Sequence, residues 1–251
     1  MLIATVAVLV VLLGVLAVRA VGLGRSDGPV DQARPGTVLL VPGFGGSQTA
    51  LDQLAARLRA AGRTATVVSL PDNGTGDLIL QAGTLDTAAR RALDDGATSV
   101  DVIGYSAGGL VTRIWVDRFD SADRARRVVT LGSPLHGARV AANGAALGAV
   151  ACPTACRQLA PGSELLNRLD QRPLPARLPW LSIWTENDET VQPPDSARLD
   201  GAVNVPLQGL CPQARVAHGE LPTDPWVTAL VLRAVAAGPM AAPTACDTVS
   251  S

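Results

Sequence analysis

The chain has 251 residues, of which 47% are hydrophobic, and a formal net charge of −1. This length suits one substantial α/β domain. The near-neutral charge and the lack of a basic run in the sequence argue against a nucleic-acid partner.

An anchoring or export segment is predicted at the amino terminus. Residues 1–18, MLIATVAVLVVLLGVLAV, carry no charged side chain. As a helix they would span roughly 27 Å, close to the thickness of a bilayer core. We expect residues 1–23 to be a transmembrane anchor or signal segment, and we favour an uncleaved anchor because the cleavage motif is poor. A buried core helix is the alternative, but the segment has no polar face.

The segment that follows is expected to be a linker. Residues 24–36, GRSDGPVDQARPG, are rich in glycine, proline and charge. The catalytic domain is expected over residues 37–240, followed by a carboxyl-terminal tail over residues 241–251. The linker therefore separates the apolar amino-terminal segment from the catalytic domain.

From residue 37 onward, strand-like and helix-like segments alternate. Short apolar strands are predicted at 37–42, 64–70, 99–104, 127–132 and 180–185, and a weaker one at 204–209. Helices are predicted at 47–62, 77–95, 107–119 and 224–238. In the first helix, Ser47 is a possible N-cap and Gly62 marks the end. The alternation predicts βαβ units around a mostly parallel sheet, an α/β fold.

The segment DVIGYSAGG, residues 101–109, contains a GxSxG motif centred on Ser106. A predicted strand precedes the motif and a predicted helix follows it. Such a sharp turn puts the serine Oγ at the carboxyl edge of the sheet, and small flanking residues relieve the crowding. A structural glycine turn is the alternative, but this context favours a catalytic nucleophile.

A serine hydroxyl is a poor nucleophile until a base takes its proton. The chain has two histidines, and this architecture uses the order serine, acid, histidine. His218 lies in a loop between the last strand and the final helix, whereas His136 precedes the acidic loop. We therefore predict that His218 is the base.

The acid is expected in the loop that follows the strand at 180–185. Its sequence, ENDETVQPPD, offers several carboxylates at the carboxyl edge of the sheet. We choose Asp188, and Glu186, Glu189 and Asp195 remain alternatives. A merely solvated acidic loop is the remaining interpretation.

Acyl transfer also needs N–H donors for the tetrahedral oxyanion. One is expected from Ala107, the residue after the nucleophile, and the other from Phe44 in the glycine-rich loop LLVPGFGGS. A glycine-rich loop that opens a helix can instead bind phosphate, but this one lacks the lysine of a P-loop and does not match GxGxxG.

The four cysteines, Cys152, Cys156, Cys211 and Cys246, suggest disulfides formed in an oxidising compartment. We expect a Cys152–Cys156 bridge around a proline-containing turn and a Cys211–Cys246 bridge to the tail, although four cysteines allow three pairings. A zinc site is a weaker interpretation, since neither histidine stands at a standard offset from a cysteine pair.

Location is predicted from two opposing signals. Arg19 and Arg25 follow the apolar segment, and the positive-inside rule would keep them in the cytoplasm. The cysteines favour export, and two arginines are weak evidence for a cytoplasmic location. We therefore expect a membrane-anchored or secreted protein with an extracytoplasmic catalytic domain.

Five segments together carry a family resemblance: LLVPGFGG, DVIGYSAGGL, LGSPLHG, ENDETVQPPDSARLDGAVNV and VAHGEL. They resemble bacterial lipases and esterases of the α/β-hydrolase fold, especially the small class 2 triacylglycerol lipases, over about residues 37–238. The resemblance implies a mostly parallel sheet flanked by helices. It also implies Ser106 as nucleophile, Asp188 as acid and His218 as base, with Phe44 and Ala107 as oxyanion donors.

Two features depart from that pattern. The amino-terminal apolar segment is not part of the small secreted lipases, and residues 134–179 are longer than in the most compact members. This insertion contains Leu147, Val150, Leu159, Leu165 and Leu166, and it is expected either to cover an acyl pocket or to be a plain pair of packing helices.

The predicted function is hydrolysis of carboxylic acyl or lipid esters through an acyl-serine intermediate, as in a lipase or esterase. An acyltransferase with the same acyl-serine is one alternative, and a non-catalytic, membrane-anchored binding module is another. An acyl ester or lipid is the expected substrate, the membrane is the expected partner of the amino-terminal helix, and no metal or organic cofactor is implied.

Overall fold

The computed structural model describes residues 30–146, 152–244 and 246. Within them, six strands form one sheet in the order β2-β1-β3-β4-β5-β6, and every neighbouring pair is parallel. The strands are β1 (Thr37–Val41), β2 (Ala65–Val67), β3 (Val100–Tyr105), β4 (Ala125–Leu131), β5 (Trp180–Trp184) and β6 (Val203–Pro206). The mostly parallel sheet that the alternating pattern predicts is therefore confirmed.

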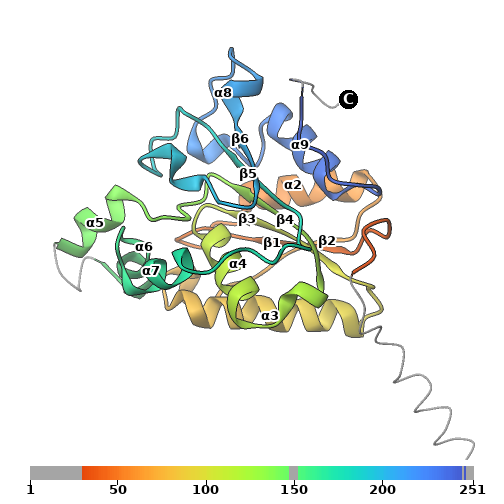
Figure 1. Cartoon of the computed structure of the whole chain (residues 1–251), viewed down its shortest axis with the longest axis horizontal. Helices are drawn as coiled ribbons and strands as arrows, with labels where there is room; N and C mark the ends of the chain where they lie inside the picture. Colours follow the sequence, from red (N-terminus) through yellow and green to blue (C-terminus); the bar gives the residue numbers. More distant parts are fainter. Residues whose placement is uncertain (1–29, 147–151, 245, 247–251) are drawn as a thin grey trace, which may run out of the picture.

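Helices cover both faces of the sheet (Figure 1). On one face lie α2 (Thr49–Ala60) and α9 (Pro225–Val235), and on the other lie α3 (Leu78–Asp94) and α4 (Ala107–Arg118). The strands supply both cores in alternation: Val102 packs with α3 and α4, while the next residue, Ile103, packs with α2 and α9. Successive strand side chains point to opposite faces, so apolar runs fit a sheet buried on both sides.

The remaining helical segments are short. The insertion between β4 and β5 forms α5 (Arg139–Ala146), α6 (Thr154–Leu159) and α7 (Glu164–Asp170), which lie together at one end of the molecule (Figure 1). Helix α8 (Leu207–Leu210) follows β6. Single 3₁₀ turns are η1 (Pro71–Gly74), η2 (Ser121–Asp123), η3 (Pro194–Ala197) and η4 (His218–Glu220).

One helix-start prediction is wrong. The N-cap residue of α2 is Gln48, not Ser47, and no side chain caps the helix there. The chain enters α2 through Gly45 and Gly46, which both have positive φ, and this turn leaves Ser47 one residue outside the cap position. The predicted apolar face is confirmed, because Leu51, Leu54, Ala55 and Leu58 are all buried.

Part of the predicted linker packs against the domain. The Gln32 amide donates to the Arg126 carbonyl at 3.0 Å, and the Gln32 carbonyl accepts from the Arg126 guanidinium. The predicted anchor at residues 1–23 and the linker residues before Val30 lie outside the described residues, as do Leu147 and Val150. None of the helices in the described ranges has the length and hydropathy to cross a bilayer.

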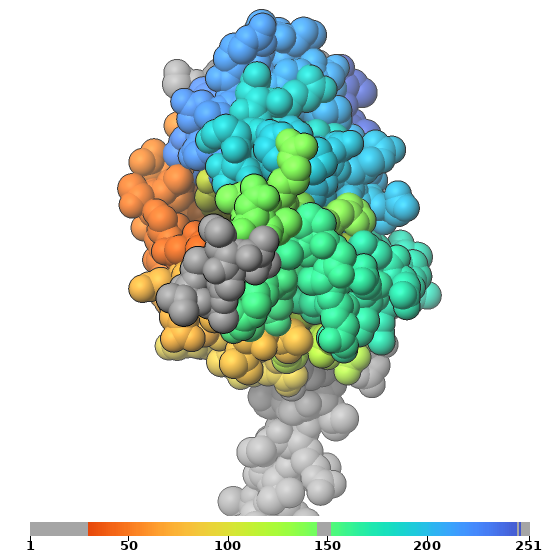
Figure 2. Space-filling model, turned by 90° about the vertical axis from the view of Figure 1, so that its left-hand side faces the viewer, coloured from red at the N-terminus to blue at the C-terminus, as the bar shows by residue number. Residues whose placement is uncertain are grey.

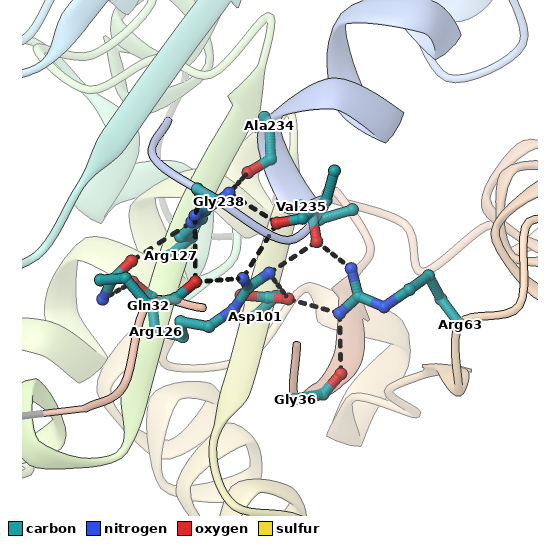
Figure 3. Close-up of polar contacts among 10 residues, drawn as sticks. Gln32, Gly36, Arg63, Asp101, Arg126, Arg127, Ala234, Val235 and Gly238 are labelled. Carbon is teal, nitrogen blue, oxygen red and sulfur yellow. Dashed lines mark hydrogen bonds and ion pairs between the residues drawn. The ribbon is translucent and has the colours of Figure 1, made fainter. Parts of the chain in front are cut away.

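A buried ionic cluster closes the amino edge of the sheet (Figure 3). Asp101, near the start of β3, is fully buried and accepts from Arg126 through both carboxylate oxygens, at 2.8 and 2.6 Å. Arg63 donates to the same carboxylate at 2.7 Å and also to the carbonyl of Val235. One carboxylate therefore compensates two guanidinium groups, that of the fully buried Arg126 and that of the partly buried Arg63.

A third arginine satisfies carbonyls at the end of α9. Arg127 donates to the carbonyls of Ala234 at 2.6 Å and Ala236 at 2.9 Å, and also to that of Gly238 (Figure 3). Burial lowers the pKa of Arg127 from its usual value, and the neighbouring Arg126 charge lowers it further. The last carbonyls of a helix have no intrahelical donor and carry partial negative charge, so they suit cationic partners.

We predict that Asp101→Ala will destabilise the fold by about 3–5 kcal/mol, because the buried Arg126 guanidinium and the partly buried Arg63 guanidinium lose their carboxylate. Urea unfolding followed by circular dichroism measures this change. Asp95→Ala, an exposed carboxylate just after α3, is the control and should stay within about 0.5 kcal/mol of the parent. Equal effects of the two substitutions would contradict the role of the cluster.

Candidate active site

Ser106 sits in the sharp turn between β3 and α4. Its backbone has φ 53° and ψ −128°, a conformation that L-residues rarely adopt. Close packing holds the turn: a Cβ on Gly104 would lie 2.5 Å from the Cα of Gly109, and one on Gly108 would overlap the Val41 carbonyl. The small residues of the motif thus let α4 approach the ends of β1 and β3, and Ser106 is presented at the carboxyl edge.

Three side chains from distant segments form a continuous hydrogen-bonded row. Ser106 Oγ lies 3.0 Å from His218 Nε2, and His218 Nδ1 lies 2.7 Å from Asp188 Oδ2. Asp188 is 2% exposed and His218 is 6% exposed. The structure therefore brings together Ser106, His218 and the carboxylate chosen in the sequence analysis, Asp188.

The loop after β5 orients the Asp188 carboxylate. Its second oxygen, Oδ1, accepts from the N–H groups of Thr190 at 2.9 Å and Val191 at 2.6 Å. Both oxygens of the buried carboxylate consequently have donors. These bonds hold the carboxylate in one orientation, in which its other oxygen can orient an imidazole.

The other candidate residues lie elsewhere. His136 is 44% exposed, and its ring contacts Asp170 Oδ1 at 2.9 Å and the Arg198 carbonyl at 3.0 Å instead of Ser106. Asp195 belongs to η3, and Glu186 is exposed on the loop. Glu189 does approach the histidine, but at its main chain: Glu189 Oε2 accepts from the His218 N–H at 3.0 Å.

Sequence reasoning missed one residue at the site, Tyr105. Its ring centroid lies 5.2 Å from that of His218, and its hydroxyl donates to the His218 carbonyl at 3.3 Å. Burial raises the pKa of Tyr105 to about 12, with smaller contributions from the Asp188 and Glu189 charges. The phenol therefore remains a donor at neutral pH. Its place inside the GxSxG motif was visible in the sequence, but nothing indicated its contact with a residue 113 positions away.

The loop after β1 lies against the nucleophile. A Cβ on Gly43 would stand 2.8 Å from the Cβ of Ser106, so the backbone there is very close to the reacting group. Ala107 is the first residue of α4, where N–H groups lack intrahelical acceptors. Phe44 is next to Gly43, and Phe44 and Ala107 both line the cavity beside Ser106. This arrangement suits two N–H donors to an oxyanion.

A cavity of about 490 Å³ opens beside Ser106 and His218. It lies toward the end of the molecule that carries α5, α6 and α7, which Figure 2 shows face on. Most of its wall is apolar, from Phe44, Ala50, Ala107, Pro134, Ala138, Val140, Ala141, Cys156, Leu159 and Val191. A larger groove, of about 1130 Å³, runs beside the edge strand β2 and contains none of the three site residues, so size alone does not identify the site.

Both expected disulfides are present in the structure. The Cys152–Cys156 bridge closes the start of α6, and Cys211–Cys246 ties the tail to the end of α8. Of the leucines in the insertion, Leu159, Leu165 and Leu166 all pack into the core, and Leu159 also lines the cavity. In the part of the chain that the structure describes, no group of three or more His, Cys, Asp or Glu is placed to hold a metal ion.

A sequence model of the family described as palmitoyl protein thioesterase matches residues 37–169. No curated protein matches the sequence. Among solved structures, lipase B from Aspergillus fumigatus is similar with 20% identity and a TM-score of 0.69, over 86% of this chain and 56% of that one. The chain thus spans little more than half of that lipase.

Two bacterial structures are also similar in fold. The mature form of a lipase from Bacillus licheniformis matches with 20% identity and a TM-score of 0.60, over 71% of this chain and 84% of that one. A gene product from Listeria innocua matches with 16% identity and a TM-score of 0.55, over 78% and 92% of the two chains. The likenesses to these lipases support the α/β-hydrolase fold.

We predict that Gly108→Ala will destabilise the protein by about 1–3 kcal/mol and greatly reduce labelling of Ser106 by a fluorophosphonate, because the new methyl group pushes α4 away from Val41. The matched control is Gly83→Ala in α3, whose Cβ would meet only ordinary contacts with Phe119. That helical substitution should stabilise the protein by about 0.5–1 kcal/mol. Thermal unfolding and labelling rates distinguish the two, and unchanged labelling of Gly108→Ala would contradict the packing argument.

Proposed function

The chain belongs to the palmitoyl protein thioesterase family, and we propose that it hydrolyses acyl esters or thioesters through an acyl-serine intermediate on Ser106. The observation that carries this proposal is the row from Ser106 through His218 to Asp188, with bonds of 3.0 and 2.7 Å. The nucleophile is within hydrogen-bond reach of the base, and the base is within reach of the orienting acid, as acyl transfer requires.

In the first half-reaction, Ser106 Oγ attacks the substrate carbonyl carbon while His218 Nε2 takes the hydroxyl proton. The Asp188 charge stabilises the imidazolium, and the N–H groups of Phe44 and Ala107 donate to the oxyanion. When the tetrahedral intermediate collapses, the bond to the alcohol or thiol breaks and His218 returns the proton to that leaving group. Water then attacks the acyl-serine with His218 again as base, which releases the acid and restores the serine.

The apolar cavity beside Ser106 favours a substrate whose acyl chain binds in it. Its wall includes Ala138 just before α5, Ala141 within α5 and Leu159 from α6. Burial of each methylene contributes about 0.8 kcal/mol, so such a wall favours fatty acyl groups over acetyl groups. The family name points to a palmitoyl thioester, and the cavity is of a size usual for ligand sites.

Two disulfides are typical of a protein that folds in an oxidising compartment. We further propose that residues 1–23 tether this extracytoplasmic domain to the membrane. The full chain should then sediment with membranes, and a chain that begins at Val30 should not. If both the full chain and the shortened chain remain in the soluble fraction, the proposed membrane anchor is wrong. That result would not contradict the proposed hydrolysis.

We predict that Ser106→Ala and His218→Ala will each lower kcat by about 10⁴-fold or more, because the three residues act as a unit. Hydrolysis of p-nitrophenyl butyrate and of a palmitoyl thioester measures the loss. His136→Ala, the second histidine, should keep activity near that of the parent. An active Ser106→Ala, or loss in His136→Ala with an active His218→Ala, would contradict the proposed function.

The acid is tested in the same assay. Asp188→Asn should retain the fold and lose most activity, since the imidazole loses its orienting charge. Asp195→Asn, an exposed carboxylate further along the loop, is the matched control. Adding an alcohol acceptor shows whether acyl transfer competes with hydrolysis.

We predict that Ala141→Phe will lower kcat/KM for palmitoyl substrates by about tenfold or more while activity on butyryl substrates changes little, because the ring occupies the apolar cavity. Ala142→Phe is the control, since its neighbour position on α5 does not line the cavity. Kinetics with acyl chains of two to sixteen carbons measure the change. Equal losses for short and long chains would indicate that the acyl chain lies elsewhere.

A further inference from the structure

A carboxylate that the proposed reaction does not use holds the main chain of His218. Glu189 Oε2 accepts from the His218 N–H at 3.0 Å, while the preceding residue, Asp188, accepts from the His218 ring at 2.7 Å. Two consecutive carboxylates of one loop therefore reach the same histidine. One orients the ring, and the other contacts the backbone that carries it.

The N–H of His218 needs an acceptor from outside the turn, because His218 stands at the start of that turn. His218 is the first residue of η4, a single 3₁₀ turn of three residues, and the N–H groups at the start of a turn have no acceptor within it. At the preceding residue, Glu220 Oε2 accepts from the Ala217 N–H at 2.8 Å. Side-chain carboxylates thus fix two successive N–H groups at the entry to the turn.

The opposite side of His218 is held by Tyr105. The phenol donates to the His218 carbonyl at 3.3 Å, and its ring packs against the imidazole at 5.2 Å between centroids. The main-chain N–H and carbonyl of His218 therefore both bond to side chains, Glu189 on one side and Tyr105 on the other. The His218 carbonyl also accepts from the Leu221 N–H within the turn at 3.3 Å. The His218 N–H, in contrast, bonds to the Glu189 carboxylate outside the turn.

We propose that Glu189 is a positioning residue for His218: its carboxylate anchors the His218 N–H, which keeps Nε2 in line with Ser106 Oγ during both proton transfers. This inference rests on the proposed function, since it gives Glu189 a role only if His218 is the base. Proton transfer depends steeply on the donor–acceptor geometry, so a small shift of the turn lowers the rate without removing a catalytic group.

The Glu189 carboxylate can act as a hydrogen-bond acceptor and as a negative charge. Two substitutions separate these two contributions. Glu189→Gln keeps an acceptor oxygen at the same position and removes the charge, whereas Glu189→Ala removes both. Glu186→Ala is the matched control, because Glu186 is an exposed carboxylate on the same loop whose side chain makes no hydrogen bond or ion pair within the described ranges. Each substituted side chain is exposed, so the fold should tolerate all three.

The experiment measures kcat and KM with p-nitrophenyl butyrate, the rate of fluorophosphonate labelling, and the thermal unfolding midpoint. We expect Glu189→Ala to lower kcat and the labelling rate by about tenfold, with KM changed by less than about twofold. Glu189→Gln should restore most of the rate, and Glu186→Ala should match the parent. If Glu189→Ala unfolds earlier, rates measured well below its midpoint still allow the comparison with Glu189→Gln.

Three results would overturn the inference: parent-like kcat in Glu189→Ala, equal losses in Glu189→Gln and Glu189→Ala, or an equal loss in Glu186→Ala. Ser106→Ala separates this failure from that of the proposed function. If Ser106→Ala is inactive and unlabelled while Glu189→Ala is normal, only the positioning role fails. If Ser106→Ala retains activity, or the parent is not labelled, the proposed function itself fails.

Discussion

The close contact between α4 and the ends of β1 and β3 is the constraint on which the site depends. Glycines at positions 104 and 108 remove the methyl groups that would separate these elements, and Ser106 between them is forced to φ 53°. Local strain of this kind persists only where the surrounding packing fixes it. Here the buried central strands of the sheet provide that packing, so Oγ is held at one fixed point of the carboxyl edge.

The two edges of the sheet carry different kinds of buried charge. At the amino edge, Asp101 and two arginines compensate one another and bind the end of α9, which stabilises the frame (Figure 3). At the carboxyl edge, Asp188 meets a histidine whose other nitrogen faces a serine. In the first cluster every guanidinium is bonded to a carboxylate or to carbonyls, whereas in the second a histidine ring lies between a carboxylate and a hydroxyl, the arrangement that the proposed proton transfers require.

The loop after β5 connects the sheet to the histidine turn. Thr185 donates to the Val216 carbonyl at 2.7 Å, Asp188 bonds to the ring of His218, and Glu189 bonds to its main chain. Three residues of one loop therefore fix a turn about thirty positions further along the chain. Because these bonds join the loop to the turn, a substitution in the loop is expected to move His218 as well.

The sequence by itself determined the fold class and the position of Ser106, because apolar periodicity and the GxSxG turn are local properties of adjacent residues. It also ordered the acid before His218, but it left four carboxylates as candidates, and only the folded chain brings Asp188 to the ring and Glu189 to the main chain. The sequence pattern likewise did not indicate the Asp101 ion cluster or the contact between Tyr105 and His218. Each depends on which residues meet across many positions of the chain, and only tertiary packing decides that.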